Sequence, residues 1–152
     1  MVQVRTIPAA ADAVPLPAGG GTGALRSAAA RIVRERGDCT LDASGLRGAD
    51  LAAVAEGALL GGYRFSRHST ALPQHLVGLA GAQDDDAVCA GLRRAAATCW
   101  ARDLANTPAS VKSPRWLGEQ ARQVLAPLGV RVAVHDDEWL ARCGFGGILA
   151  VG

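Results

Sequence analysis

The spacing of small apolar residues is the strongest constraint on how this chain can fold. Leu51, Val54, Ala55, Ala58 and Leu59 recur at intervals that place them on one face of a helix. Ala, Val and Leu must also fill most of the core, because aromatic residues make up only 4% of the 152 residues. Side chains of this size let helices approach closely but bury less apolar area than a Leu/Phe-rich core. We therefore expect closely packed helices and modest stability.

Short apolar strands alternate with such helices along the first part of the chain. The predicted strands are 2–6 ("VQVRT"), 39–43 ("CTLDA") and a run within 74–82 ("QHLVGLAGA"). The predicted helices cover about 25–36, 51–60 and 87–104. Thr22 and Asp50 stand where the N-caps of the first two helices are expected. This alternation predicts an α/β fold.

A second unit follows, and it begins with a clear helix start. Ser113 can act as N-cap with Pro114 at the first helical position, where proline is favoured. Residues 130–134 ("VRVAV") alternate as a strand, 135–144 form a short capped helix, and 146–152 ("GGILAVG") read as a buried strand. Helix, strand, helix and strand are the opening of another α/β domain. We expect its last strand to expose an edge and an apolar face, which favours association.

The stretch "CWARDLANTPASVKSP" (99–114) marks the boundary between the two units. The helix must end before Pro108, because the residue preceding a proline avoids α geometry. Arg102 and Asp103 are expected to bond backbone groups at this helix end, with a subunit or active-site wall as the alternative. The expected parts are an α/β domain (1–97), a helix end and junction (98–113), and the incomplete start of a second α/β domain (114–152).

Charge and hydropathy argue against two classes of partner. Sixteen Lys and Arg and 14 Asp and Glu residues give a formal net charge of +2, with no block of like charge. A nucleic-acid surface would need a denser basic stripe. No stretch approaches the roughly 18 apolar residues of a membrane span, and the N-terminus does not resemble a signal peptide. We therefore predict a cytoplasmic protein that binds neither nucleic acid nor membrane.

None of the chemically reactive residues forms a recognisable site. The glycine run 19–23 precedes a helix but lacks the Walker lysine, which favours a flexible turn over a phosphate loop. The aspartates 84–86 stand before a helix, which favours capping over cation binding. The predicted sets of catalytic, cofactor-binding and metal-binding residues are therefore empty.

The cysteines and histidines are scattered and contain no C-x-x-C pair, so neither a zinc site nor a thiol redox site is predicted. We expect the thiols to be buried and structural. The scattered cysteines are Cys39, Cys89, Cys99 and Cys143, and the scattered histidines are His68, His75 and His135.

Three segments resemble, in order, sequence motifs of the leucyl (cytosol) aminopeptidase family. Residues 101–108 ("ARDLANTP") resemble the A-R-D-L-x-N-x-P signature that begins the catalytic domain. Residues 56–65 ("EGALLGGYRF") resemble the E-G-x-x-L-G-x-Y-x-F stretch late in the N-terminal domain. Residues 128–152 resemble L-G-V-x-V-x-V-x-D followed by the Gly-rich M-G-G-x-L-x-V-G strand. The resemblance covers about 51–152, whereas 1–50 match only loosely.

The resemblance implies a shortened, macro-like N-terminal α/β domain followed by the first helices and strands of an α/β metallopeptidase domain. It also implies a cytoplasmic exopeptidase that removes N-terminal residues, often leucine, from peptide substrates and assembles as a hexamer. The complete family enzyme uses two divalent metals, manganese or zinc. Paired metals polarise the scissile carbonyl and lower the pKa of a bridging water.

The departures from the family pattern limit what carries over. The G-x-x-x-D-x-G-G and N-T-D-A-E-G-R type motifs of the family are absent, and Lys112, the only lysine, lies outside any matching motif. We therefore expect a fragment of a leucyl aminopeptidase that binds no metal and is inactive by itself. The alternative is a non-catalytic assembly or regulatory module that docks on full-length partners. A third possibility is a small-molecule binder that uses residues 19–23.

Overall fold

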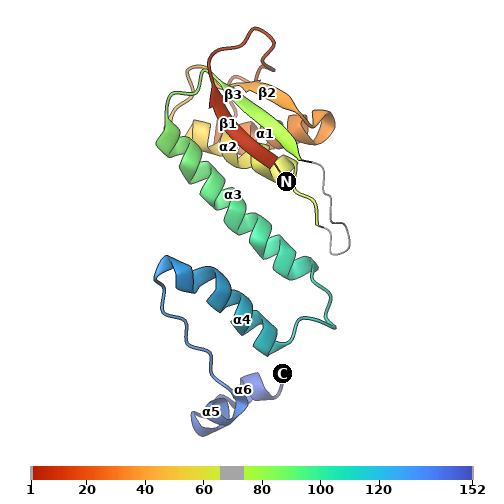
Figure 1. The fold of residues 1–152 in the computed structure, drawn as a ribbon, viewed down its shortest axis with the longest axis vertical. Helices are drawn as coiled ribbons and strands as arrows, with labels where there is room; N and C mark the ends of the chain where they lie inside the picture. The colour runs from red at the N-terminus through yellow and green to blue at the C-terminus, as the bar shows by residue number, and fades with distance from the viewer. Residues whose placement is uncertain (1, 66–73, 152) are drawn as a thin grey trace. The chain divides into compact units, whose positions relative to one another are not determined.

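The computed structural model of the chain describes residues 2–65 and 74–151 and divides into two units, Met1–Asn106 and Thr107–Gly152. The α/β class is confirmed, and the strands and helices expected in the first unit are present (Figure 1). The identification of 1–97 and 114–152 as separate domains stays a prediction. The first unit contains β1 (Val2–Ile7), α1 (Gly21–Arg36), β2 (Cys39–Asp42), α2 (Gly48–Gly61), β3 (His75–Ala80) and α3 (Asp85–Asn106). The second contains α4 (Pro114–Leu125), η1 (Ala126–Leu128), α5 (Asp137–Arg142) and α6 (Gly146–Leu149).

The strands of the first unit form one parallel sheet in the order β1-β3-β2. Val4 lies opposite Val77, and Leu41 lies opposite Leu79. These side chains belong to one apolar cluster with residues of α1 and α2, which cover this face of the sheet (Figure 1). The helix residues of that cluster include Leu25, Ala29, Val33, Leu51, Val54, Ala55 and Ala58. Four of the five residues of the stripe expected in the second helix therefore belong to the core, whereas the fifth, Leu59, is half-buried.

The helices of the first unit pack with their backbones in close contact. A Cβ atom added at Gly57 would collide with the carbonyl oxygen of Arg26, and one added at Gly61 would collide with that of Ala30. These glycines stand one turn apart on α2 and face α1. Gly91 of α3 meets the backbone of α2 in the same way. Glycine is required at these positions because no side chain fits between the backbones.

One aspartate caps two helices. Oδ2 of Asp84 accepts a hydrogen bond from the backbone N–H of Gly48 at 2.9 Å, and Oδ1 accepts one from that of Ala87 at 3.0 Å. These two bonds lower the pKa of Asp84, the bond from Gly48 contributing most. Capping by the 84–86 run is thus confirmed for Asp84. Its carboxylate holds the first turns of α2 and α3 together.

The two other expected N-caps are wrong. α1 begins at Gly21 with Gly20 as its N-cap, two residues before Thr22, because Gly19 to Gly21 take positive φ angles that lead the chain into the helix earlier. α2 begins at Gly48 with Arg47 as its N-cap, and Asp50 lies inside its first turn. The side-chain acceptor at that end is Asp84, from a segment distant in sequence.

In the second unit the helix starts are confirmed and both expected strands are wrong. Oγ of Ser113 accepts a hydrogen bond from the N–H of Trp116 at 3.1 Å, with Pro114 in the first turn. Residues 130–134 form neither helix nor strand, and α6 stands within 146–152. A strand needs a neighbour to complete its backbone hydrogen bonds, and the described residues after 106 offer none. A helix makes these bonds within itself.

Apolar side chains of the second unit remain exposed. None of its described residues is fully buried, and the exposed fractions are 73% for Leu128 and 57% for Ile148. The expectation of an exposed apolar face therefore holds for side chains, although the strand proposed to carry it is absent. Val134 packs against α4 at Gly118.

Replacing Gly57 by Ala is expected to destabilise the first unit by about 1–3 kcal/mol, because the added methyl group must push α1 away from α2. Gly23→Ala is the matched control, since nothing lies within 4 Å of the Cβ position at Gly23 in α1. That control should leave the free energy of unfolding unchanged or raise it by up to ~1 kcal/mol. Urea denaturation followed by circular dichroism measures both variants, and equal stability of the two would contradict the close packing.

The double cap predicts a specific acid sensitivity. The pKa of Asp84 is lower in the folded chain than its ordinary value of about 3.9. Its contribution to stability is therefore complete above about pH 4 and is lost as the pH falls through the folded pKa. Asp84→Asn keeps one acceptor oxygen, and so only one of the two caps, and should reduce this acid dependence. Asp84→Ala removes both caps and should lower the unfolding temperature at pH 7 more than Asp84→Asn does. Thermal unfolding between pH 2 and 7 tests this.

Candidate functional site

Residues of two motif segments meet around Tyr63, directly after α2. Its hydroxyl donates a hydrogen bond to Oδ1 of Asp103 at 2.7 Å and accepts one from Nδ2 of Asn106 at 3.3 Å. The guanidinium carbon of Arg102 lies 5.4 Å from the centre of the Tyr63 ring, within cation–π range. We call these four residues the Tyr63 cluster. It joins segment 56–65 to segment 101–108.

The electrostatics of the Tyr63 cluster keep the phenol protonated. Burial raises the pKa of Tyr63 above its usual value, and the hydrogen bond to the Asp103 carboxylate raises it further. A phenolate beside this carboxylate would bring two negative charges together. Tyr63 is therefore a hydrogen-bond donor at neutral pH. The expected structural role of Asp103 agrees with this contact, although the partner shown here is a side chain and not the backbone.

Glu56, from the same motif segment, joins three helices. Its carboxylate lies 3.6 Å from Nη1 of Arg26 on α1 and 3.3 Å from Nε of Arg94 on α3. The Glu56 side chain is 13% exposed, whereas the two arginines are about half exposed. An acidic group at this depth requires such partners. The arrangement is a structural ion pair network.

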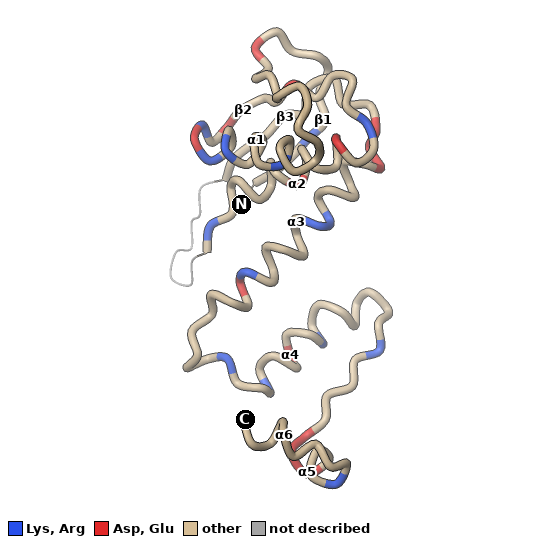
Figure 2. The backbone as a smooth tube through the Cα atoms, turned by 180° about the vertical axis from the view of Figure 1, so that it is seen from behind, with Lys and Arg blue, Asp and Glu red and all other residues tan. Residues whose placement is uncertain are grey.

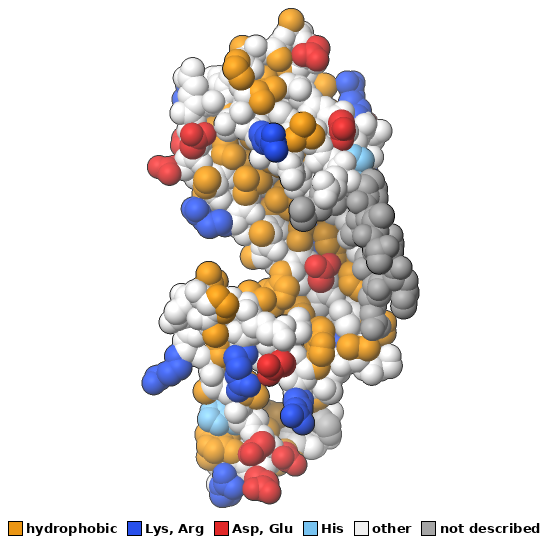
Figure 3. Space-filling view, viewed as in Figure 1, with side chains coloured by type: hydrophobic (Ala, Val, Ile, Leu, Met, Phe, Trp, Pro, Cys, Tyr) orange, Lys and Arg blue, Asp and Glu red, His pale blue; other side chains and the backbone are white. Residues whose placement is uncertain are grey.

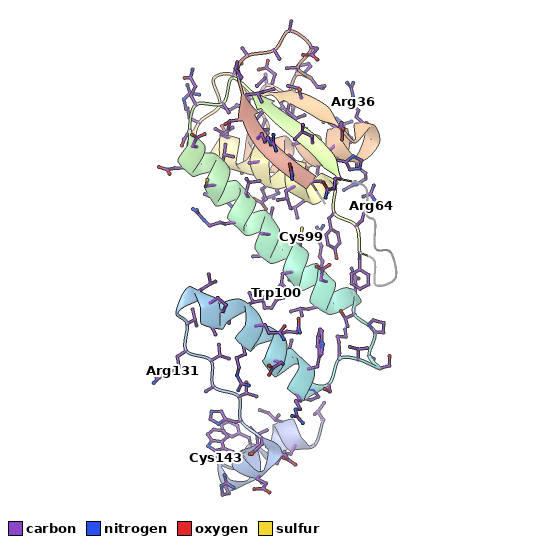
Figure 4. The ribbon with its side chains drawn as sticks, viewed as in Figure 1. Arg36, Arg64, Cys99, Trp100, Arg131 and Cys143 are labelled. Carbon is purple, nitrogen blue, oxygen red and sulfur yellow. The ribbon has the colours of Figure 1, made fainter. Side chains whose placement is uncertain are left out.

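A hollow of about 500 Å³ opens over β2 and β3. Its charged lining residues are Arg5, Asp12, Arg36 and Asp38, and Arg36 stands at the end of α1 (Figure 4). Two guanidinium and two carboxylate groups oppose each other there, so the lining favours neither an anion nor a cation. The geometry therefore selects no ligand class.

The thiols do not form a common site. Cys39 and Cys99 are half-buried, and burial raises the pKa of both thiols, which disfavours the reactive thiolate. Cys89 and Cys143 are exposed, so the expectation of buried thiols is wrong for these two. Figure 4 shows Cys99 on α3 and Cys143 close to α5. Cys89 and Cys143 stand on helix surfaces or ends, where no core neighbour encloses the sulfur.

The histidines are also dispersed. Nδ1 of His75 lies 3.2 Å from Oδ1 of Asp38, and the ring of His135 stacks on Trp139 with 3.7 Å between ring centres. His68 lies outside the described residues. Across residues 2–65 and 74–151, no three His, Cys, Asp or Glu side chains come together as metal ligands would.

Charged side chains are interspersed on the surface. Basic and acidic residues are both spread along the backbone (Figure 2) and lie mixed on the visible face (Figure 3). This distribution agrees with the low net charge and shows no basic stripe on that face. None of the described helices has an apolar stretch long enough to cross a bilayer.

Sequence reasoning missed the Tyr63 cluster and the hollow. The residues lining the hollow come from four separate segments, 5–7, 12–14, 36–40 and 76–78, so no local spacing could have marked them. The Tyr63 cluster had a usable signal, because Tyr63 and Asp103 both stand in segments that resemble family motifs. Their contact could have been proposed from that coincidence, but their separation of 40 residues hid it.

Comparisons with known proteins agree on one family. The sequence profile of the "Cytosol aminopeptidase family, catalytic domain" matches residues 99–152. A "Probable cytosol aminopeptidase" of Syntrophotalea carbinolica is 38% identical over 110 residues, which cover 64% of this chain and 22% of that protein. One of Mycobacterium marinum is 39% identical over 109 residues, which cover 66% of this chain and 21% of that protein.

A solved structure gives the same result for the fold. The "Bottromycin maturation enzyme BotP" superposes with a TM-score of 0.76 and 36% sequence identity, covering 90% of this chain and 32% of that chain. The chain spans about a fifth of the length of the curated relatives it matches. On this sequence identity and shared fold, the chain belongs to the cytosol aminopeptidase family.

Proposed function

We propose that this chain is a segment of a cytosol aminopeptidase, carrying an α/β unit and the first part of the catalytic domain, and that it does not hydrolyse peptides by itself. One observation carries the proposal: residues 99–152 match the catalytic-domain profile in a chain that spans only 21–22% of its curated relatives. The complete protein would remove N-terminal residues from peptides in the cytoplasm, use two divalent metals, and form a homo-oligomer, which is a hexamer in the family.

The described side chains do not fit a dinuclear metal centre. Such a centre needs several converging carboxylates, and residues 2–65 and 74–151 bring no such group together. Asp84, from the acidic run 84–86, already accepts two backbone hydrogen bonds. The Tyr63 cluster contains one carboxylate, which is bonded to the phenol. We therefore assign no catalytic step to the residues of this chain.

An aminopeptidase assay tests this proposal. The purified chain, incubated with leucine p-nitroanilide and manganese, should give no more product than buffer. Manganese is the first metal to try because one structure of the similar enzyme BotP is described as "in complex with Mn". The complete aminopeptidase of Syntrophotalea carbinolica serves as the positive control under the same conditions. Turnover that follows the chain through purification and dialysis would contradict the proposal.

A non-catalytic assembly role is the second candidate, and the exposed face of α4 favours it. Leu117 is 51% exposed and Val124 is 38% exposed, and their spacing of seven residues places them on one side of the helix. Exposed apolar side chains in a row are typical of surfaces that associate with protein. This face would bind another copy of the chain or a full-length relative.

Self-association through α4 would be removed by a charge on its apolar face. Val124→Glu should shift the chain toward monomer in size-exclusion chromatography with light scattering. Gln123→Glu adds the same charge at a neighbouring exposed position and should leave the mass distribution unchanged. A wild-type chain that is monomeric at about 100 μM, where weak protein contacts still form, would argue against the assembly role.

A further inference from the structure

The second half of α3 extends beyond the core of the first unit. The buried residues of α3 are Ala87, Val88, Gly91 and Ala95. The helix then continues to Asn106, and its described residues beyond Ala95 are exposed or half-buried, including Cys99 and Trp100 (Figure 4). Residue 99 is also where the match to the catalytic-domain profile begins. Core packing therefore does not account for the position of this half of the helix.

Segment 56–65 contacts α3 at two points. Glu56 forms its ion pair with Arg94, next to the last buried residue of α3. Tyr63 forms its hydrogen bonds with Asp103 and Asn106, in the last turns of the helix. The first contact lies at the edge of the core, and the second lies beyond it.

We propose that Tyr63 is a positioning residue that fixes the C-terminal end of α3, from which the polypeptide continues into the catalytic-domain match. The phenol donates a hydrogen bond to Asp103, accepts one from Asn106 and presents its ring to Arg102. Three side chains near the end of the helix, at positions 102, 103 and 106, are thereby held by one residue from outside it. This inference goes beyond the proposed function, and its test needs no catalytic activity.

Hydrogen exchange on the whole chain tests the contact directly. Tyr63→Phe keeps the ring over Arg102 and removes only the hydroxyl, so peptides covering 99–106 should exchange about three- to tenfold faster. Peptides from β3 and α2 should exchange as in wild type. Thr98→Val is the matched control. It removes a hydroxyl that belongs to α3 itself and donates a hydrogen bond to the Arg94 carbonyl, so the contact with Tyr63 stays intact. The proposal would be overturned if Tyr63→Phe accelerated exchange throughout the first unit, or if it left the exchange rate at 99–106 unchanged.

Variants of Asp103 separate the hydrogen bond from other contacts of that residue. Asp103→Asn keeps an acceptor oxygen and should retain most of the protection at 99–106, whereas Asp103→Leu should lose it. In the Tyr63→Phe background, Asp103→Leu should increase the exchange rate at 99–106 by a smaller factor than it does alone, because the shared hydrogen bond is already gone. If the factors by which the two substitutions increase the exchange rate simply multiply in the double variant, the two residues act independently and the proposal is refuted.

A spectroscopic titration gives an independent readout of the hydrogen bond between Tyr63 and Asp103. Tyr63 is the only tyrosine in the chain, so absorbance near 295 nm reports its ionisation alone. The wild-type midpoint should lie above the usual value of about 10, because burial and the hydrogen bond to Asp103 raise the pKa of Tyr63. Asp103→Asn should lower that midpoint. A midpoint that does not respond to this change would count against the contact.

Discussion

The close approach of three helix backbones is the constraint on which the rest of the first unit depends. At Gly57, Gly61 and Gly91 the backbones of α2 and its neighbouring helices come so close that no side chain fits between them. At this short separation the carboxylate of Glu56 reaches arginines on both α1 and α3. The same packing directs α3 past Tyr63, where its last turns find hydrogen-bond partners. A larger side chain at one glycine would therefore disturb contacts well beyond its own position.

The motif residues that relate this chain to the cytosol aminopeptidases have structural contacts in this part of the molecule. Glu56 and the glycines of segment 56–65 join helices, and Tyr63 holds Asp103 and Asn106 of segment 101–108. These contacts give a structural reason for the recognisable patterns in two segments that lie far apart in sequence. They connect an α/β unit to the start of a catalytic-domain sequence, and the catalytic chemistry of the family is proposed to reside elsewhere in the complete protein.

Helix positions were predictable from the sequence where the signal is local. The apolar stripe of α2, the Ser113–Pro114 start of α4 and the aspartate before α3 are each encoded within a few residues. The N-caps of α1 and α2 were not, because the first depends on left-handed glycines and the second on a carboxylate from a distant loop. The two strands expected after residue 129 are absent. Their alternating or continuous apolar pattern describes a side-chain preference, whereas a strand exists only with a partner for its backbone.

The sequence by itself determined the α/β class, the approximate positions of the helices and strands of the first unit, and the family. Helical periodicity and short motifs contain that information, because both depend on residues that are neighbours in the chain. Only the tertiary structure decided that Asp84 caps two helices, that Glu56 pairs with Arg26 and Arg94, and that Tyr63 binds the end of α3. Each of these contacts spans about 30 residues or more, apart from the cap of α3. They arise when glycines bring the helix backbones together, and spacing along the chain does not encode such distances.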